Sequence, residues 1–372
     1  KGHIDGCILA HDANLIFAEK MYELGATVSI PTTINAISVN LNNWENQGVE
    51  PDFGNKASRL ADAYEKMGGH PTYTCAPYLL EDKPQRDEVI GWSESNAVIY
   101  ANSILGAKTQ KHPDYLDLFI AMTGRAPKAG VYLNENRIPK IEISVQLPTD
   151  FDDSIWPMLG WLIGDLSPNK IPLVSGLEMA SPSDDDLKAL CAAFGTTSAA
   201  PMLHINGHTP GKVYSIPSKL KNFNITKQHL AKLWNKFNYA DLRVDLVAIG
   251  SPHASLTECQ SFVKFFDGKN CNPNVKTIIT IGRDILSKAK SEGLVEKITS
   301  AGVQIISDIC WCSITEPIFP PEASVIMTNS GKYAHYAHGL TGRKTRFGSL
   351  KDCAIAAQSG WAKSELPEWL SN

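Results

Sequence analysis

The stretch "VDLVAIGSPHASLTE" at residues 244–258 begins as a continuous apolar run and ends in polar residues. Such a run is typical of a strand buried on both faces, as in a parallel sheet covered by helices. Ser255 and Glu258 stand at capping-box spacing, so a helix should begin directly after it. Three later segments repeat the pattern, and they are "VKTIITIG" at 275–282, "VQIISDI" at 303–309 and "ASVIMTN" at 323–329. This alternation of strand and helix predicts an α/β fold.

The N-terminal part of the chain shows the same alternation. The segment "HDANLIFAEKMYELGA" at 11–26 predicts a helix with Ala13, Phe17, Met21 and Leu24 on one face, and the short β-type run "TVSIPTTIN" follows it. A second helical segment, "NKASRLADAYEKMGG", precedes "PTYTCAPYL" in the same way. We therefore expect α/β units in both halves of the chain.

Length and charge limit the possible functions. A chain of 372 residues is too long for one small core, so two or three domains are expected. The net charge of −4 gives no basic surface for nucleic acid or an anionic membrane, and small molecules are the expected partners. No apolar run reaches the roughly 18 residues that crossing a bilayer requires, which favours a cytoplasmic protein. Eight irregularly spaced cysteines do not suggest a disulfide framework.

The polar ends of the apolar runs should converge, because ligands bind beyond the carboxyl ends of the strands in open α/β sheets. This groups Ser251, His253, Cys310 and Lys332. Cys310 could be a metal or cluster ligand or a buried packing thiol, and we favour the ligand. Cys312 could join it as a chelating pair, but we interpret it as a packing residue. Lys332 after Gly331 suits a substrate carboxylate or phosphate.

Two further segments carry chemistry. In "TCAPY", the proline keeps Cys75 extended, so its thiol can project towards a ligand. In "GWSESNAVIYANS", Glu94 and Ser95 lie in an otherwise small, apolar segment, so they either cap a helix or touch a ligand. Glycine-rich phosphate loops, HExxH, GxSxG and CxxC motifs are missing from the sequence. The remaining thiols, lysine, carboxylate and hydroxyl suit Lewis-acid elimination of water from a hydroxy acid.

The successive motifs "GHIDGC", "VSIPTTIN", "TCAPYL", "SESNAVIYANSILGAKT", "AMTGRAP", "GSPHAS", "SDIC" and "MTNSGKYAHY" resemble the aconitase X family across nearly the whole chain. The resemblance implies aconitase-like stacked three-layer α/β domains with mostly parallel sheets. It also implies an iron–sulfur-dependent dehydratase. Some members of the family act on cis-3-hydroxy-L-proline, and archaeal two-subunit members act on mevalonate 5-phosphate. The opening "GHIDGC" favours the hydroxyproline branch.

The resemblance also implies roles for individual residues. Cys75 and Cys310 correspond to the cluster ligands, and Lys332, Glu94 and Ser95 to catalytic positions. The substrate-binding positions would be Gly6, Cys7, Ile8, Asn35, Ala36 and, in the "GSPH" turn, His253. The archaeal form has cysteine where this chain has Ser251, which is an additional candidate ligand here. Loss of that thiol favours a [2Fe-2S] centre over a [3Fe-4S] or [4Fe-4S] cluster.

The expected division of the chain is a first α/β lobe over 1–165, on which 330–372 packs back, a connecting lobe over 166–225 and a further α/β domain over 226–329. The small swivel domain or subunit of the family is expected to be absent from this chain. The expected reaction converts cis-3-hydroxy-L-proline to pyrroline-2-carboxylate. The alternatives are dehydration of mevalonate 5-phosphate and a non-catalytic paralogue that binds a cluster.

Overall fold

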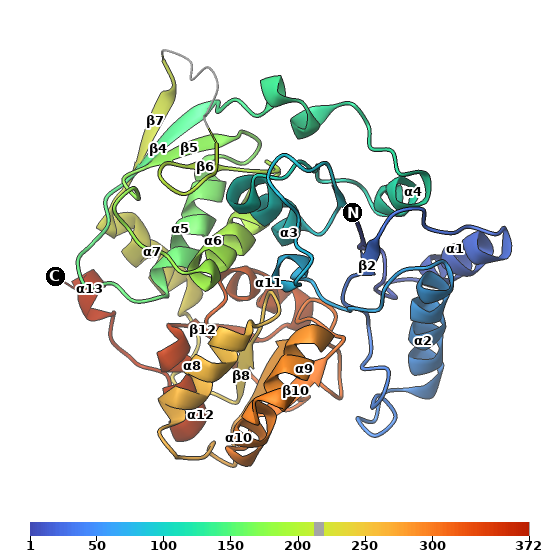
Figure 1. Ribbon diagram of the computed structural model, residues 1–372. Helices are drawn as coiled ribbons and strands as arrows, with labels where there is room; N and C mark the ends of the chain where they lie inside the picture. Colours follow the sequence, from blue (N-terminus) through green and yellow to red (C-terminus); the bar gives the residue numbers. More distant parts are fainter. Residues whose placement is uncertain (212–218, 372) are drawn as a thin grey trace.

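The computed structural model describes residues 1–211 and 219–371, and its strands form three separate sheets in which every assigned pair is parallel. The predicted α/β architecture with parallel sheets is therefore confirmed. The three sheets and their helices are arranged around α3 and α11, which lie near the centre of the molecule (Figure 1).

The first sheet has the order β2–β1–β3 and is built from very short strands. Its strands are β1 (Gly2–Ile4), β2 (Thr32–Ile34) and β3 (Gly91–Trp92). Its helices are α1 (Asp12–Glu23), α2 (Pro51–Lys66), α3 (Ser95–Tyr100), which continues as a π-helix over Ala101–Leu105, and α4 (Leu116–Thr123). Single turns of 3-10 helix cover Pro77–Leu79, Gly130–Tyr132 and Asn134–Asn136.

The second sheet has the order β6–β5–β4–β7. It contains β4 (Ile141–Val145), β5 (Pro172–Ser175), β6 (His204–Ile205) and β7 (Lys221–Ile225), with helices α5 (Ile155–Leu166), α6 (Asp184–Thr197) and α7 (Lys227–Phe237). The expected boundary at residue 166 therefore falls inside this unit, after β4 and α5. The segment rich in Pro, Ser and Asp that suggested it contains β5 and then Ser183, the N-cap of α6.

The third sheet contains the four apolar runs and has the order β10–β9–β8–β11–β12. Its strands are β8 (Leu246–Ile249), β9 (Lys276–Ile281), β10 (Gln304–Ser307), β11 (Val325–Thr328) and β12 (Lys344–Phe347). Its helices are α8 (Leu256–Phe266), α9 (Arg283–Ser291), α10 (Leu294–Ser300), α11 (Gly331–Thr341) and α12 (Leu350–Ser359). Residues after 330 thus extend this sheet, and α11 also packs on α5 and α6, so this segment contacts the expected first lobe as well. Both β12 and α13 (Glu368–Ser371) contact α7.

The local signals in the sequence explain where two helices lie. The predicted capping box is confirmed at α8, where Ser255 Oγ accepts a hydrogen bond from the Glu258 amide. In α1 the buried residues are Leu15 and Ala18, and Leu24 of the predicted apolar face is 72% exposed. The buried stripe of α1 is therefore rotated relative to the predicted one, although Phe17 and Met21 of the predicted face still pack, partly buried, against the same core.

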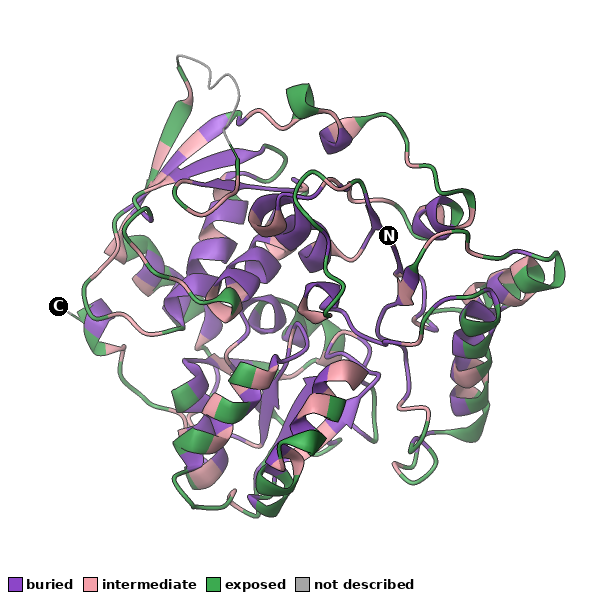
Figure 2. Ribbon diagram, viewed as in Figure 1, coloured by how far each residue is buried: buried purple, intermediate pink, exposed green. Residues whose placement is uncertain are grey.

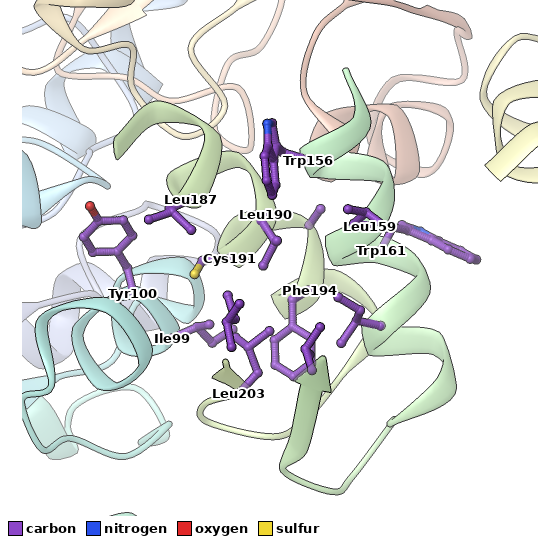
Figure 3. Packing of buried hydrophobic residues seen from close by; sticks show 14 of the residues in the cluster. Ile99, Tyr100, Trp156, Leu159, Trp161, Leu187, Leu190, Cys191, Phe194 and Leu203 are labelled. Atoms are coloured by element: carbon purple, nitrogen blue, oxygen red, sulfur yellow. The ribbon is translucent and has the colours of Figure 1, made fainter. Parts of the chain in front are cut away.

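Helices α3, α5 and α6 enclose a continuous core that connects the first and second units. Buried side chains concentrate there, whereas α8, α9 and α10 keep exposed outer faces (Figure 2). In Figure 3, Ile99 and Tyr100 of α3 approach Cys191 and Leu187 of α6, and Leu159 of α5 lies on the other side of α6. No helix in the described ranges is long and apolar enough to cross a membrane.

Gly160 allows α5 and α6 to approach closely, and this yields a prediction. A Cβ atom at this position would lie 2.1 Å from the Leu190 carbonyl oxygen, which is backbone and cannot rotate away. We expect Gly160→Ala to lower the free energy of unfolding by about 1–3 kcal/mol, because the helices must separate. Urea unfolding followed by circular dichroism measures this change.

Gly339 in α11 provides the matched control, since a Cβ atom there would meet no atom within 4 Å. Gly339→Ala should raise the free energy of unfolding by about 0.5–1 kcal/mol through helix propensity. Equal effects of the two substitutions would contradict the close-packing argument.

Candidate active site

The carboxyl ends of the first and third sheets meet, as the strand-end argument predicts. Ile37, which follows β2, forms a parallel bridge with Ile309, which follows β10. Glu94 follows β3 and is the N-cap of α3, and Lys332 is the second residue of α11 after β11. The Lys332 Nζ lies 3.0 Å from Glu94 Oε1, so an ion pair connects the two sheets at this junction.

This ion pair is largely withdrawn from solvent, with the side chain of Lys332 10% and that of Glu94 14% exposed. Burial alone would raise the pKa of Glu94, but the charge and hydrogen bond of Lys332 outweigh it and hold the pKa at about 2. Burial would lower the pKa of Lys332, but Glu94 and the nearby thiols keep it well above the usual value. Glu94 is therefore a carboxylate and Lys332 an ammonium at neutral pH.

Three thiols gather beside this pair. Cys75 and Cys310 are buried together with Ala36, and Cys312 packs against them with part of its surface exposed. The Cys312 thiol lowers the pKa of Cys310 as a hydrogen-bond partner, but the Cys75 thiol and burial together raise that pKa to about 12. Cys75 and Cys310 are distant in sequence and meet as the sequence predicts. Glu94, Lys332, Cys75 and Cys310 form the central site.

The donor set suits an iron centre with few protein ligands. Among the described residues, no group of three or more His, Cys, Asp or Glu side chains is arranged to hold a metal ion. The central site therefore lacks a closed ligand shell like that of a structural four-cysteine site. Two adjacent thiols can still bind one iron of a small cluster as thiolates, because metal binding removes the thiol protons. Cys312 packs against these thiols and keeps part of its surface exposed.

A rigid turn presents Cys310 at the end of β10. Asp308 has a φ of 73°, and its carboxylate accepts two hydrogen bonds from Arg283, at 2.7 and 2.9 Å. The Asp308 carbonyl oxygen also accepts a hydrogen bond from the Ile37 amide at 2.7 Å. The bidentate pair and the sheet-to-sheet bond together fix the backbone that leads into the thiol.

Two expected site residues lie in the "GSPH" turn. His253 is fully buried, donates its backbone N–H to Cys75 Sγ at 3.3 Å and bonds the Ile309 carbonyl oxygen through Nε2 at 2.8 Å. Its ring is therefore enclosed by protein, and its backbone supports Cys75. Ser251 accepts a hydrogen bond from Ser330 through its carbonyl oxygen and lines a cavity of about 20 Å³ with Lys188.

The other expected substrate positions lie around the central site. Gly6 and Ile8 follow β1, and the thiol of Cys7 is 1% exposed and donates to the Ile4 carbonyl oxygen. Cys7 could therefore contact a ligand only through its backbone. Asn35 and Ala36 follow β2, and the Asn35 side-chain oxygen accepts a hydrogen bond from the Ala36 amide at 2.7 Å. The Asn35 amide nitrogen consequently points at Glu94 Oε2, 3.4 Å away.

Two chemically important residues were missed by the sequence analysis. Asp5 also accepts a hydrogen bond from the Asn35 amide nitrogen, although nothing except its place in "GHIDGC" marks it in the sequence. Lys111 donates from Nζ to the Ser198 carbonyl oxygen at 2.8 Å, and burial lowers its pKa to about 8. The charges of Glu94 and Lys332 both act on it, so it lies near the central site.

Models of the aconitase X family match the chain in three consecutive parts. The first domain matches residues 1–135, the second 139–235 and the third 244–359. These ranges follow the three sheets. The holo-form crystal structure of Thermococcus kodakaraensis aconitase X superposes with a TM-score of 0.85 at 29% identity, and the match covers 95% of this chain and 88% of that one.

Several curated relatives match the chain, two of them at higher sequence identity than this crystal structure. Two proteins named cis-3-hydroxy-L-proline dehydratase, from Pseudomonas aeruginosa and Hypocrea jecorina, are 42% and 43% identical over 100% of the chain. The chain spans 65% and 64% of their lengths. The phosphomevalonate dehydratase large subunit of Methanothermobacter thermautotrophicus is 30% identical over 89% of this chain and 81% of its own length. Domain by domain and along nearly its whole length, the chain belongs to the aconitase X family.

Proposed function

We propose that the chain is the catalytic part of a hydro-lyase that eliminates water from cis-3-hydroxy-L-proline and forms pyrroline-2-carboxylate. The observation that carries this proposal is the buried Lys332–Glu94 pair beside the thiols, in a chain 42% identical throughout to a protein named for this activity. Glu94, Asp5 and Ser95 keep part of their surface exposed, so a small molecule can reach the site.

The charges of the central site match an imino acid. Lys332 offers an ammonium to the substrate carboxylate, and Glu94, ionised because its pKa is about 2, can accept a hydrogen bond from the protonated ring nitrogen. Ser95, at the first position of α3, is adjacent to Glu94 and can orient the hydroxyl or ring nitrogen. Mevalonate 5-phosphate carries no cation that could join Lys332 as a partner of Glu94, which favours the hydroxyproline branch.

Cys75 and Cys310 are the residues that would hold an iron–sulfur centre, for which we favour the [2Fe-2S] form. Such a centre, when bound, supplies Lewis acidity towards a substrate oxygen. The chain's own contribution is positional, because His253 orients Cys75 through its backbone N–H and Arg283 fixes the turn before Cys310. The protein would act together with a small swivel domain or subunit that closes over the site.

The first test compares substrates and site variants in the complete enzyme, with the small domain present. We expect turnover of cis-3-hydroxy-L-proline and none of mevalonate 5-phosphate, measured as pyrroline-2-carboxylate formed. Lys332→Ala and Glu94→Gln should each lower kcat/KM by about 100-fold or more, because each loses one charged contact with the zwitterion. The double variant should lose little beyond either single variant, since the two groups act as a unit.

Lys290→Ala, at an exposed position of α9, is the matched control and should retain wild-type turnover. Unchanged turnover in both site variants would exclude this assignment of roles. Preferred turnover of mevalonate 5-phosphate would indicate the other enzyme branch, and a bound cluster without turnover of either would indicate a cluster-binding paralogue.

The second test concerns iron. Cys75→Ser and Cys310→Ser should purify anaerobically with less than about half the wild-type iron and a bleached visible spectrum, because each removes a thiolate ligand. Retention of iron in Cys312→Ser would identify Cys312 as a packing residue, and loss would identify a third ligand. Cys271→Ser is the control, because this half-buried thiol packs against Gly302. Full iron content in both Cys75→Ser and Cys310→Ser would refute the proposed ligands.

A further inference from the structure

Two carboxylates share one amide group at the central site. The Asn35 side-chain nitrogen donates to Asp5 Oδ1 and also lies 3.4 Å from Glu94 Oε2. The orientation of this amide is determined, because its oxygen is already occupied by the Ala36 amide at 2.7 Å. Asp5 and Glu94 are therefore held on either side of Asn35, at the carboxyl ends of two neighbouring strands, β1 and β3.

The two carboxylates have opposite surroundings. Glu94 has a cationic partner in Lys332 at 3.0 Å, whereas no cation among the described residues compensates Asp5. Asp5 instead faces further acidic groups: its backbone N–H donates to Asp117 Oδ2 at 2.6 Å, and Asp114 lies nearby. Like charges this close disfavour ionisation of the carboxyl that lacks a counterion. Burial, then Glu94 and then Asp117 raise the pKa of Asp5 well above its usual value.

Asp5 is less deeply buried than two of its neighbours. As a residue it is half-buried, like Glu94, whereas Asn35 is 2% exposed and Asp117 is fully buried. It directly precedes Gly6, Cys7 and Ile8, the backbone positions expected to contact substrate. Asp5 thus borders the expected substrate positions and lies opposite an ionised carboxylate, in surroundings that disfavour its own ionisation. Two carboxyl groups whose surroundings push their pKa values apart are a common acid and base arrangement in enzymes.

We propose that Asp5 is the proton donor to the departing hydroxyl group in the elimination. This inference rests on the proposed function. The electron pair of the C2–H bond forms the C2–C3 double bond as the general base that the elimination requires takes the C2 proton. The C3–O bond breaks, and the Asp5 carboxyl proton joins the departing oxygen to release water. Asp5 becomes a carboxylate and the base becomes protonated, so one proton returned to Asp5 and one lost to solvent restore the enzyme.

The alternative is that Asp5 only positions Asn35 or stabilises the turn after β1. A change of leaving group distinguishes these roles. Chloride can leave as an anion without being protonated, whereas the hydroxyl group must receive a proton to leave as water. An enzyme that lacks its proton donor should still eliminate HCl from cis-3-chloro-L-proline, giving the same unsaturated product. An enzyme with a misplaced Asn35 should lose both reactions together.

The experiment measures kcat for cis-3-hydroxy-L-proline and cis-3-chloro-L-proline in the complete enzyme and its variants. Asp5→Asn keeps an oxygen that can accept the Asn35 hydrogen bond and removes only the acidic proton. We expect it to lose about 100-fold or more in kcat with the hydroxy substrate and less than about threefold with the chloro substrate. Asp5→Glu restores a carboxyl group, so its kcat with the hydroxy substrate should be at least tenfold higher than that of Asp5→Asn.

Glu135→Gln is the matched control, since it removes a negative charge at an exposed position that is not among the groups acting on Asp5, and it should leave both reactions close to wild type. Equal losses of Asp5→Asn with both substrates, or no loss with the hydroxy substrate, would overturn the proton-donor role. Failure of the wild-type enzyme to turn over cis-3-hydroxy-L-proline would overturn the proposed function itself, and the two failures are thereby distinct.

Discussion

The ion pair between Lys332 and Glu94 is the interaction on which the central site depends. It connects α11 of the third sheet to the start of α3 in the first sheet, at a point where both side chains are largely buried. Removing one partner would leave the other charge unpaired in a poorly solvated place, which costs several kcal/mol. A pair of this kind holds two sheets in register and at the same time presents two opposite charges to whatever binds beside it.

Parallel topology explains why residues so distant in sequence meet. All strands of a parallel sheet end at the same edge, and here two such edges face each other across the Ile37–Ile309 bridge. Cys75, which precedes a 3-10 turn, and Cys310, which follows β10, are brought together at this junction. The left-handed backbone of Asp308, held by Arg283, completes the turn that aims Cys310 at the junction.

Periodicity and strand-end chemistry predicted the parallel α/β architecture and the grouping of Cys310 with Lys332, because both follow from local pattern. The extent of each unit could not be predicted in the same way, since β4 joins its sheet through pairings with β5 and β7 that composition does not reveal. The burial of His253 could not be predicted for a related reason: a histidine in a turn looks exposed until its neighbours are known. Asp5 was missed because its importance comes from Glu94 and Asp117, which are distant in sequence.

The sign of the charge at the site bears on which substrate fits. Near neutral pH, Glu94 is ionised, and Asp117 is mostly ionised because burial raises its pKa only to about 6. Lys332 contributes one positive charge against these two negative charges, and Lys111, whose pKa burial lowers to about 8, contributes a second one nearby. Burial and the neighbouring carboxylates raise the pKa of Asp5 and so disfavour its charged form. A phosphorylated substrate would add further negative charge to this group, whereas an imino acid brings an ammonium as well as a carboxylate. Electrostatic complementarity therefore favours a zwitterion, and the binding of its cation would reinforce the ionised state of Glu94.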